Sequence, residues 1–177
     1  MTYEEIRTAL LAEPRPHDAL ATPDSAIVYA VFLNPRGLLL PIKPGANGLL
    51  YVGASSDGQH ARNHYVQSTS HSSLRRTLGA ILRWHLGLNP TSRAGESESF
   101  AFPDDSEIIL SRWMRANLLT CTIPAEGHDL EKLEVQLIAE LQPPLNLTHW
   151  ENPQRTVIKK LRADCVALAK TATRVAA

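Results

Sequence analysis

The succession of elements that the sequence predicts places the protein in the α+β class, as a small, mainly antiparallel three-stranded sheet flanked by helices. Three observations support this class. Two apolar runs rich in β-branched and aromatic residues are separated by turn residues, a third such run stands alone later, and helical spacing of apolar residues fills most of the remainder. At 177 residues the chain can bury one core, and we expect a single domain over residues 1–177.

The first half of the chain predicts two helices around a pair of strands. A helix is expected over about residues 2–13, before a proline-rich linker. AIVYAVFL (26–33) and GLLYVGAS (48–55) are bounded by turn residues, which predicts two buried strands in antiparallel pairing. SLRRTLGAILRWHL (73–86) follows a capping serine, and its apolar residues recur at helical spacing.

The second half begins with a loop, a helix and a strand. NPTSRAGESES (89–99) is rich in turn residues and is expected to be a mobile loop. DDSEIILSRWMRANL (104–118) starts with a capping signal and predicts a helix. The buried face of that helix would hold Ile108, Ile109, Trp113 and Leu118. LLTCTIP (118–124) predicts a short strand, and another helix follows over 129–141.

The last predicted helix covers about residues 152–175. Asn152 would be its N-cap, and Pro153 would be its first residue. Its buried side would hold Val157, Leu161, Cys165 and Leu168.

Composition excludes several classes of protein. No apolar window is long enough for a membrane span, and the acidic start of the chain is unlike a secretory signal, so we expect a cytoplasmic protein with no membrane partner. Cys121 and Cys165 stand alone in apolar patterns, which favours reduced core cysteines over a zinc site or a disulfide framework. A formal net charge of +0 argues against a surface that is positive everywhere.

The charges are unevenly distributed along the chain. Residues 61–93 hold five arginines and no acid, residues 94–151 hold three basic and eleven acidic residues, and residues 152–177 hold six basic residues and one acid. A basic face could meet nucleic-acid phosphates if the fold brings one group of residues, Arg62, Arg75, Arg76 and Arg83, near another, Lys159, Lys160 and Arg162. Arg75, Arg76 and Lys159 are our candidates for such contacts. The alternative is that these charges solvate helix surfaces.

Glu134 lies close to the middle of an apolar arc on the helix over 129–141. At about 100° per residue, that arc also contains Leu130, Leu133, Leu137, Ile138 and Leu141. An ionised carboxylate that faces a core costs several kcal/mol unless it is paired, protonated or bound to a metal. Either Glu134 meets a local arginine or the rim of the core, or it is a metal ligand or acid–base residue in a cleft.

Four short motifs occur in a characteristic order. IVY in the first strand is followed by YVG in the second, by an arginine, and by ExxLIxxxxPPLN on a later helix. The residues that carry these motifs are Tyr29, Tyr51, Gly53, Arg62, Glu134, Leu137, Ile138, Pro144 and Asn146. Their order and spacing resemble the GIY-YIG nuclease superfamily over about residues 26–150, and the flanking phrases resemble stand-alone bacterial members. Residues 1–25 and 152–175 would flank this core.

The resemblance implies a metal-dependent endonuclease that hydrolyses phosphodiester bonds of DNA. Glu134 would hold Mg²⁺ or Mn²⁺ through oxygen, together with water and substrate phosphates. Arg62 would donate two N–H groups to the scissile phosphate. RNA remains an open alternative to DNA, and a homodimer is one way in which such an enzyme could cut both strands.

The same resemblance assigns roles to the other candidates. Tyr29 would act as a base or orient the attacking water, and Tyr51 would orient the water or the phosphate. A free phenol titrates near 10, so Tyr29 could act as a base only with help from a metal, an arginine or a histidine nearby. Asn146 would hold the site together by hydrogen bonds.

The sequence departs from the family pattern at several positions. Ile27 stands where the first motif has glycine, Val52 replaces the isoleucine of the second motif, and the segment between the two tyrosines is longer than in the smallest members. Val66 stands where family members often have His or Tyr, so His64, our candidate, or Tyr65 would have to serve instead. These departures motivate a second interpretation, a catalytically impaired module that binds nucleic acid or protein.

Overall fold

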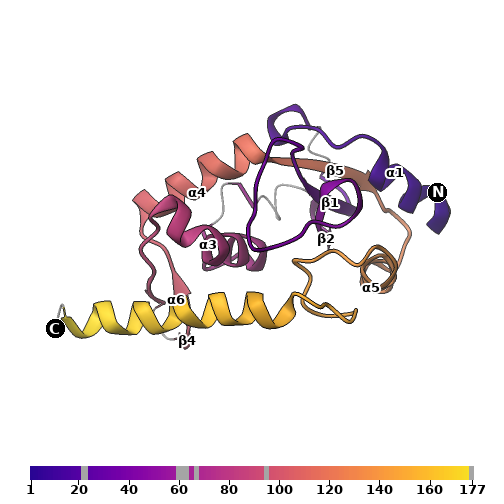
Figure 1. Cartoon of the computed structure of the whole chain (residues 1–177). Coiled ribbons are helices and arrows are strands. Elements are labelled where there is room, and N and C mark those ends of the chain that lie inside the picture. The colour runs from indigo at the N-terminus through magenta and orange to yellow at the C-terminus, as the bar shows by residue number, and fades with distance from the viewer. Residues whose placement is uncertain (21–23, 59–63, 66–67, 94–95, 176–177) are drawn as a thin grey trace. The chain divides into compact units, whose positions relative to one another are not determined.

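The computed structural model describes residues 1–20, 24–58, 64–65, 68–93 and 96–175 (Figure 1). They form two compact units. The first, which we call the sheet unit, comprises Met1–Leu38, Lys43–Asn63 and Asn117–Asn152. The second, the helical unit, comprises Leu39–Ile42, His64–Ala116 and Pro153–Ala177. The single domain expected over residues 1–177 stays a prediction.

A three-stranded antiparallel sheet lies at the centre of the sheet unit and confirms the predicted α+β class. Its strands are β1 (Ile27–Leu33), β2 (Leu49–Ser55) and β5 (Leu118–Pro124), in the order β2-β1-β5. Ala30 of β1 lies opposite Val52 of β2 and opposite Cys121 of β5. All residues of β1 are buried, in agreement with the apolar sequence of this central strand.

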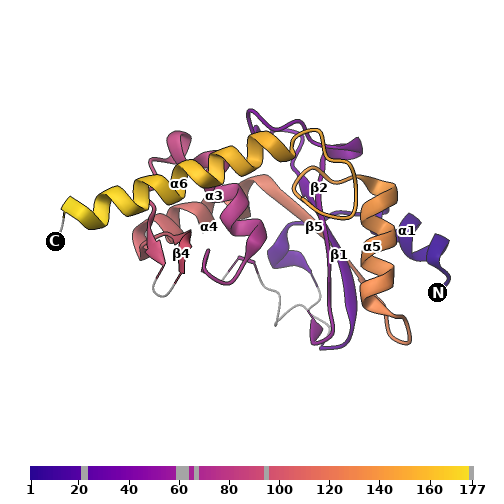
Figure 2. The ribbon, with the colours of Figure 1, turned by 90° about the horizontal axis from the view of Figure 1, so that it is seen from below.

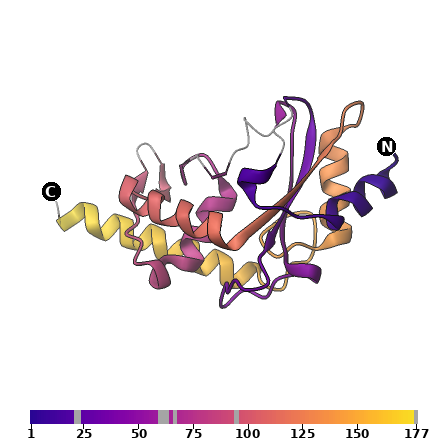
Figure 3. The same cartoon turned by 90° about the horizontal axis from the view of Figure 1, so that it is seen from above.

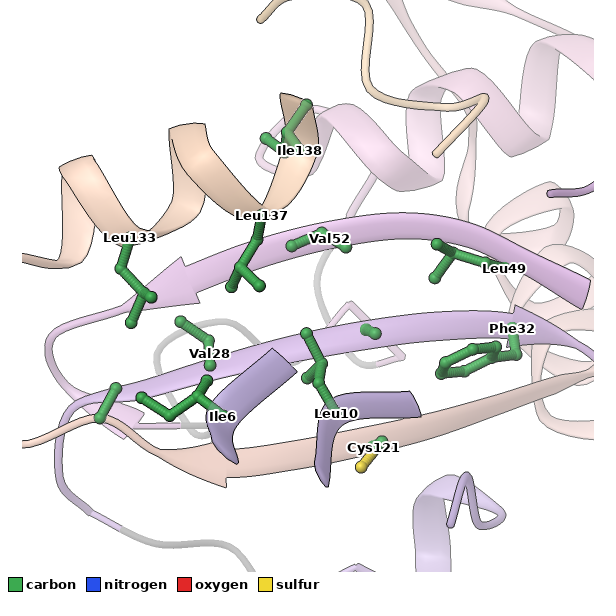
Figure 4. Packing of buried hydrophobic residues seen from close by; sticks show 12 residues of the cluster. Ile6, Leu10, Val28, Phe32, Leu49, Val52, Cys121, Leu133, Leu137 and Ile138 are labelled. Carbon is green, nitrogen blue, oxygen red and sulfur yellow. The ribbon is translucent and has the colours of Figure 1, made fainter. Parts of the chain in front are cut away.

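Helices α1 (Tyr3–Ala12) and α5 (Leu130–Leu141) cover one face of this sheet (Figures 3 and 4). Two 3-10 turns, η1 (His17–Ala19) and η2 (Ala46–Gly48), lie in the connections. The helices and the sheet enclose a core of Ile6, Leu10, Val28, Ala30, Phe32, Leu49, Val52, Cys121, Ala125, Leu133, Leu137 and Ile138. Because strand side chains alternate between faces, Tyr29 points to the face opposite α1 and α5.

The helical unit contains α3 (Ser73–Leu86), most of α4 (Asp104–Asn117) and α6 (Arg155–Val175). It also contains a two-stranded sheet of β3 (Thr91–Arg93) and β4 (Glu96–Ala101). This hairpin corrects the prediction of a mobile loop over 89–99. Phe100 is buried, and Ser92 Oγ donates to the carbonyl oxygen of Ala169 in α6, so tertiary contacts stabilise strands whose own sequence is rich in turn residues.

The buried face of α4 differs from the predicted one. Ile108 and Ile109 are 56% and 37% exposed, whereas Ser106, Leu110 and Met114 are buried. The buried residues follow one another at intervals of four, as one face of a helix requires. The prediction for the two isoleucines was therefore wrong, because the sequence contains more apolar residues than one helix face can bury.

The last helix begins later than predicted and buries a different set of residues. Its first residue is Arg155, so Asn152 is not its N-cap. Cys165 is buried as expected, but Val157 and Leu168 are exposed, and Ile158 and Ala169 are buried in their place. None of the helices among the described residues is both long enough and apolar enough to cross a membrane.

Candidate active site

Tyr29 and Tyr51 lie side by side on neighbouring strands. Their ring centroids are 6.2 Å apart, and the ring planes are inclined by 34°. Tyr29 of β1 pairs with Gly53, and Tyr51 of β2 pairs with Val31. Both side chains therefore leave the same face of the sheet, and Tyr29 is 5% exposed while Tyr51 is half-buried.

Gly53 is the residue that accommodates the phenol of Tyr29. A Cβ atom at Gly53 would lie 2.5 Å from Cζ and 3.0 Å from Cε1 of Tyr29, and it would also collide with the phenol oxygen. The strand does not place Gly53 in the left-handed region, so the requirement here is for space and not for backbone freedom. The glycine of the YVG motif and the tyrosine of the IVY motif thus form one packed pair.

Glu134 lies beside the end of the outer strand β2. It is half-buried on α5 and lines a hollow of about 440 Å³ with Ala54, Ser55, Ser56, Asp57, Leu130 and Glu131. Its neighbours Leu133 and Leu137 are buried against the sheet. Glu134 shares their face of the helix, but it lies where the edge of the sheet ends, so a hollow replaces the packing that the apolar arc alone would predict.

The donor groups of this hollow fit a hard divalent cation. Three carboxylates, those of Glu134, Glu131 and Asp57, line it together with the serines that end β2. In the part of the chain that the structure describes, no three His, Cys, Asp or Glu residues are placed to hold a metal together. Mg²⁺ keeps several of its waters and needs only one or two carboxylates, so an oxygen-rich hollow around Glu134 suits this ion.

Asn146 extends the sheet at the outer edge of β2. Its Oδ1 accepts from the Val52 N–H, and its Nδ2 donates to the Val52 carbonyl oxygen, each at 2.9 Å. The Leu145 N–H donates to the carbonyl oxygen of Leu50 at 2.9 Å. The side chain therefore pairs with β2 as a neighbouring strand would, at the residue between Tyr51 and Gly53.

Asn152 supports the turn that carries Asn146, a role that the sequence did not suggest. Its Nδ2 donates to the carbonyl oxygens of Pro144 at 2.7 Å and Asn146 at 2.9 Å. Trp150 Nε1 also donates to the carbonyl oxygen of Asn146, at 2.9 Å. The order N-x-x-x-W-x-N could have drawn attention to this network, but the predicted helix cap was the simpler interpretation of Asn152.

Comparison with known protein families identifies the family of this chain. A family model described as the GIY-YIG catalytic domain matches residues 39–164. The chain belongs to this family. No curated protein and no solved structure matches the chain. The matched range of this GIY-YIG protein includes Tyr51, Gly53, Glu134 and Asn146 but begins after β1. Tyr29 contacts Gly53 of this range, on the face of the sheet opposite α5, the helix that carries Glu134.

His64 belongs to the helical unit of this GIY-YIG protein. It is 6% exposed, and its Nδ1 lies 2.7 Å from the hydroxyl oxygen of Ser72, the N-cap of α3. Its neighbour Tyr65 is also buried. Arg62 and Val66 lie outside the described residues. The contribution of these positions to the site stays a prediction.

Arg75 does not contact solvent, which corrects its assignment as a phosphate contact. It is 0% exposed, and its Nη2 lies 2.6 Å from Oε2 of Glu107. Further donors reach the carbonyl oxygens of His64, at 2.9 Å, and of Glu107, at 3.1 Å. A guanidinium with these partners ties the segment before α3 to α4 and has no face left for a ligand.

Arg76 and Lys159 are placed differently from Arg75. The half-buried Arg76 donates to the carbonyl oxygens of Thr69 and Ser70, at 3.4 and 3.1 Å, and Lys159 is exposed on α6. Both remain candidates for phosphate contact.

Proposed function

We propose that this GIY-YIG protein is an endonuclease that hydrolyses phosphodiester bonds of DNA with Mg²⁺ or Mn²⁺. The family is a nuclease family whose members generally use divalent metals. The observation that carries the proposal is the arrangement along β2. Tyr29 packs on Gly53, Asn146 pairs with the adjacent Val52, and the hollow that contains Glu134 begins at Ala54.

Glu134 is the residue that would hold the metal ion, with water filling most of the other coordination positions. When bound, the ion supplies a Lewis acid that stabilises the negative charge developing on the phosphate oxygens. The hollow around this carboxylate, about 440 Å³, leaves room for a phosphate beside it. A divalent ion would also explain why an acid occupies the apolar arc of α5.

Tyr29 and Tyr51 would position the attacking water. Gly53 and the sheet hold the Tyr29 phenol in one place, so this phenol can orient a water molecule without a large entropic cost. Proton transfer to Tyr29 requires a nearby positive charge, which we assign to Arg62, with His64 as the residue that replaces the family residue expected near Val66. Arg62 would also bind the scissile phosphate with two N–H donors.

Asn146 is a positioning residue in this proposal. Both polar atoms of its amide bind the backbone of Val52, so they are engaged with β2 and not aimed at a substrate. Its contribution is to hold the edge of β2 between Tyr51 and Gly53 in a fixed register.

Cleavage of supercoiled plasmid tests the proposal. We expect nicked or linear product with Mg²⁺ or Mn²⁺ and none with EDTA. Glu134→Gln is expected to lower the cleavage rate by about 100-fold or more, as for other residues that stabilise transition-state charge. Glu131→Gln is the matched control, because Glu131 lines the same hollow on the same helix, and it is expected to retain cleavage within a few-fold of the parent.

Two results would contradict the proposal: no cutting with either ion, or equal cutting by the parent and Glu134→Gln. Binding of DNA without cleavage under any metal would instead favour a module that only binds nucleic acid. Parallel reactions with single-stranded and duplex RNA decide between the two kinds of nucleic acid.

A further inference from the structure

Helices α3 and α6 of the helical unit carry a large excess of positive charge. The sequence of α3 contains three arginines and no acid, and that of α6 contains six lysines and arginines with Asp164 as the single acid. The two helices pack side by side (Figure 2). Positive charges that are distant in the sequence therefore lie close together in the structure, although the formal net charge of the whole chain is zero.

Arg162 of α6 is a half-buried charge in this region. Among the residues that the structure describes, it makes no hydrogen bond or ion pair. Burial lowers the pKa of the Arg162 guanidinium, and the positive charge of Arg76 lowers it further. Arg76 itself donates to the carbonyl oxygens of Thr69 and Ser70, which orient its guanidinium. Two guanidiniums thus lie near each other at a partly desolvated place.

Arg162 also continues a basic stripe along α6. At about 100° per residue, Arg155, Lys159 and Arg162 lie within an arc of about 60°. Arg155 and Lys159 are exposed. Asp164 lies on the far side of the helix, where it pairs with Lys160 at 3.0 Å. Asp164 therefore does not neutralise the stripe.

We infer that Arg76, Arg155, Lys159 and Arg162 form a binding surface for the phosphate backbone of a nucleic acid, which we call the α3–α6 basic surface. Phosphodiesters would supply the negative charge that Arg162 lacks, and guanidinium groups bind phosphate oxygens in pairs. The stripe is about 10 Å long, and phosphates of one strand recur about every 3.4 Å along a duplex, so it can meet more than one of them.

The choice of nucleic acid as ligand rests on the proposed function, because a membrane of anionic lipids presents phosphates too. None of the residues to which we assign a role in cleavage belongs to the α3–α6 basic surface. It would supply affinity without sequence preference, since phosphate contacts position a nucleic acid but do not read its bases.

Binding in EDTA tests the inference separately from cleavage. The probe is a fluorescein-labelled DNA duplex, and its anisotropy is measured with increasing protein at several salt concentrations. Arg162→Gln is compared with Lys160→Gln, which removes the same charge from the opposite side of α6. We expect Arg162→Gln to weaken binding on the order of tenfold at low salt and to reduce the salt slope by about 0.9, as for one lost phosphate contact. We expect the effect of Lys160→Gln to be much smaller.

Thermal unfolding adds a readout that a structural role could not imitate. Arg162→Gln relieves burial of a charge and repulsion from Arg76, so the midpoint of unfolding should stay the same or rise while affinity falls. Arg162→Glu should raise the midpoint further and weaken binding more, because a glutamate there would pair with Arg76.

Several outcomes would overturn the inference. These are no duplex binding by the parent at low salt, equal losses in Arg162→Gln and Lys160→Gln, or binding to anionic lipid vesicles in preference to the duplex. The two proposals fail in different ways. If DNA binding depends on Arg162 but no metal supports cleavage, the α3–α6 basic surface stands and the nuclease proposal is refuted. If the parent cuts and binds DNA and Arg162→Gln changes neither activity, the nuclease proposal stands and the α3–α6 basic surface is refuted.

Discussion

Replacement of Gly53 by alanine is expected to displace the Tyr29 phenol. We expect a large loss in the rate of cleavage and a modest loss in the free energy of unfolding. The new methyl carbon would lie 2.5 Å from Cζ of Tyr29, where ordinary contact between carbon atoms requires about 3.5 Å or more. The ring must therefore move by roughly 1 Å, or the two strands must separate. Since Tyr29 is 5% exposed, the ring has little free space to enter.

The expected change in the free energy of unfolding combines two opposing effects. Overpacking of a well-packed site costs about 1–3 kcal/mol. Alanine also narrows the conformations of the unfolded chain, which stabilises the fold by about 0.4–1 kcal/mol at a compatible backbone position. We therefore expect the free energy of unfolding to fall by about 1–2 kcal/mol. A misplacement of about 1 Å in a catalytic group costs on the order of 100-fold in rate, so cleavage should suffer more.

Urea unfolding and plasmid cleavage measure these two effects, and a double-mutant cycle assigns their cause. In the Tyr29→Ala background the obstructing ring is absent, so adding Gly53→Ala should no longer destabilise the protein and could stabilise it slightly. The same loss of stability from Gly53→Ala with and without the Tyr29 ring would refute the reasoning. Unchanged cleavage by Gly53→Ala would refute the assignment of Tyr29 to the reaction.

Three further changes test other parts of the structure. Asn146→Ala should destabilise the protein by about 2 kcal/mol in urea unfolding, because the N–H and the carbonyl oxygen of Val52 each lose a partner. Arg75→Ala should cost about 3–5 kcal/mol because the Glu107 carboxylate is left unpaired, and the double change with Glu107→Ala should cost less. Burial raises the pKa of the Cys165 thiol to about 11 from 9.0, so the folded state holds this proton more tightly. The stability of the parent relative to Cys165→Ala should therefore fall as the pH rises from about 9 to about 11, and a constant difference over that range would contradict the shift.

Elements whose burial pattern is complete in the local sequence were predicted well. β1 is apolar along its whole length, so its sequence indicates a central strand without reference to any partner. The cap of α3 follows from a serine next to the helix, and the structure identifies it as Ser72. The motif residues were found in the same way, because their spacing is a property of the chain.

Elements that depend on a partner were not predicted. The β3–β4 hairpin lacks an alternating pattern of its own and forms against α6, where Ser92 bonds to Ala169. On α4, Ile108 and Leu110 are equally apolar, and their burial differs because of the side from which neighbouring elements approach. Arg75 is a similar case, since neither its charge nor its place in the helix indicates the acid, Glu107, that lies 32 residues away.

The sequence by itself therefore determined the fold class, the strands and helices of the GIY-YIG core, and the residues from which a nuclease site could be built. These follow from apolar periodicity, capping residues and motif spacing, which are short-range properties of the chain. Tertiary structure alone decided that Tyr29 packs on Gly53, that Glu134 lies in a hollow at the end of β2, and that Arg162 lies half-buried near Arg76. Each of these contacts joins residues that are far apart in the sequence, so no short-range pattern of the chain indicates it.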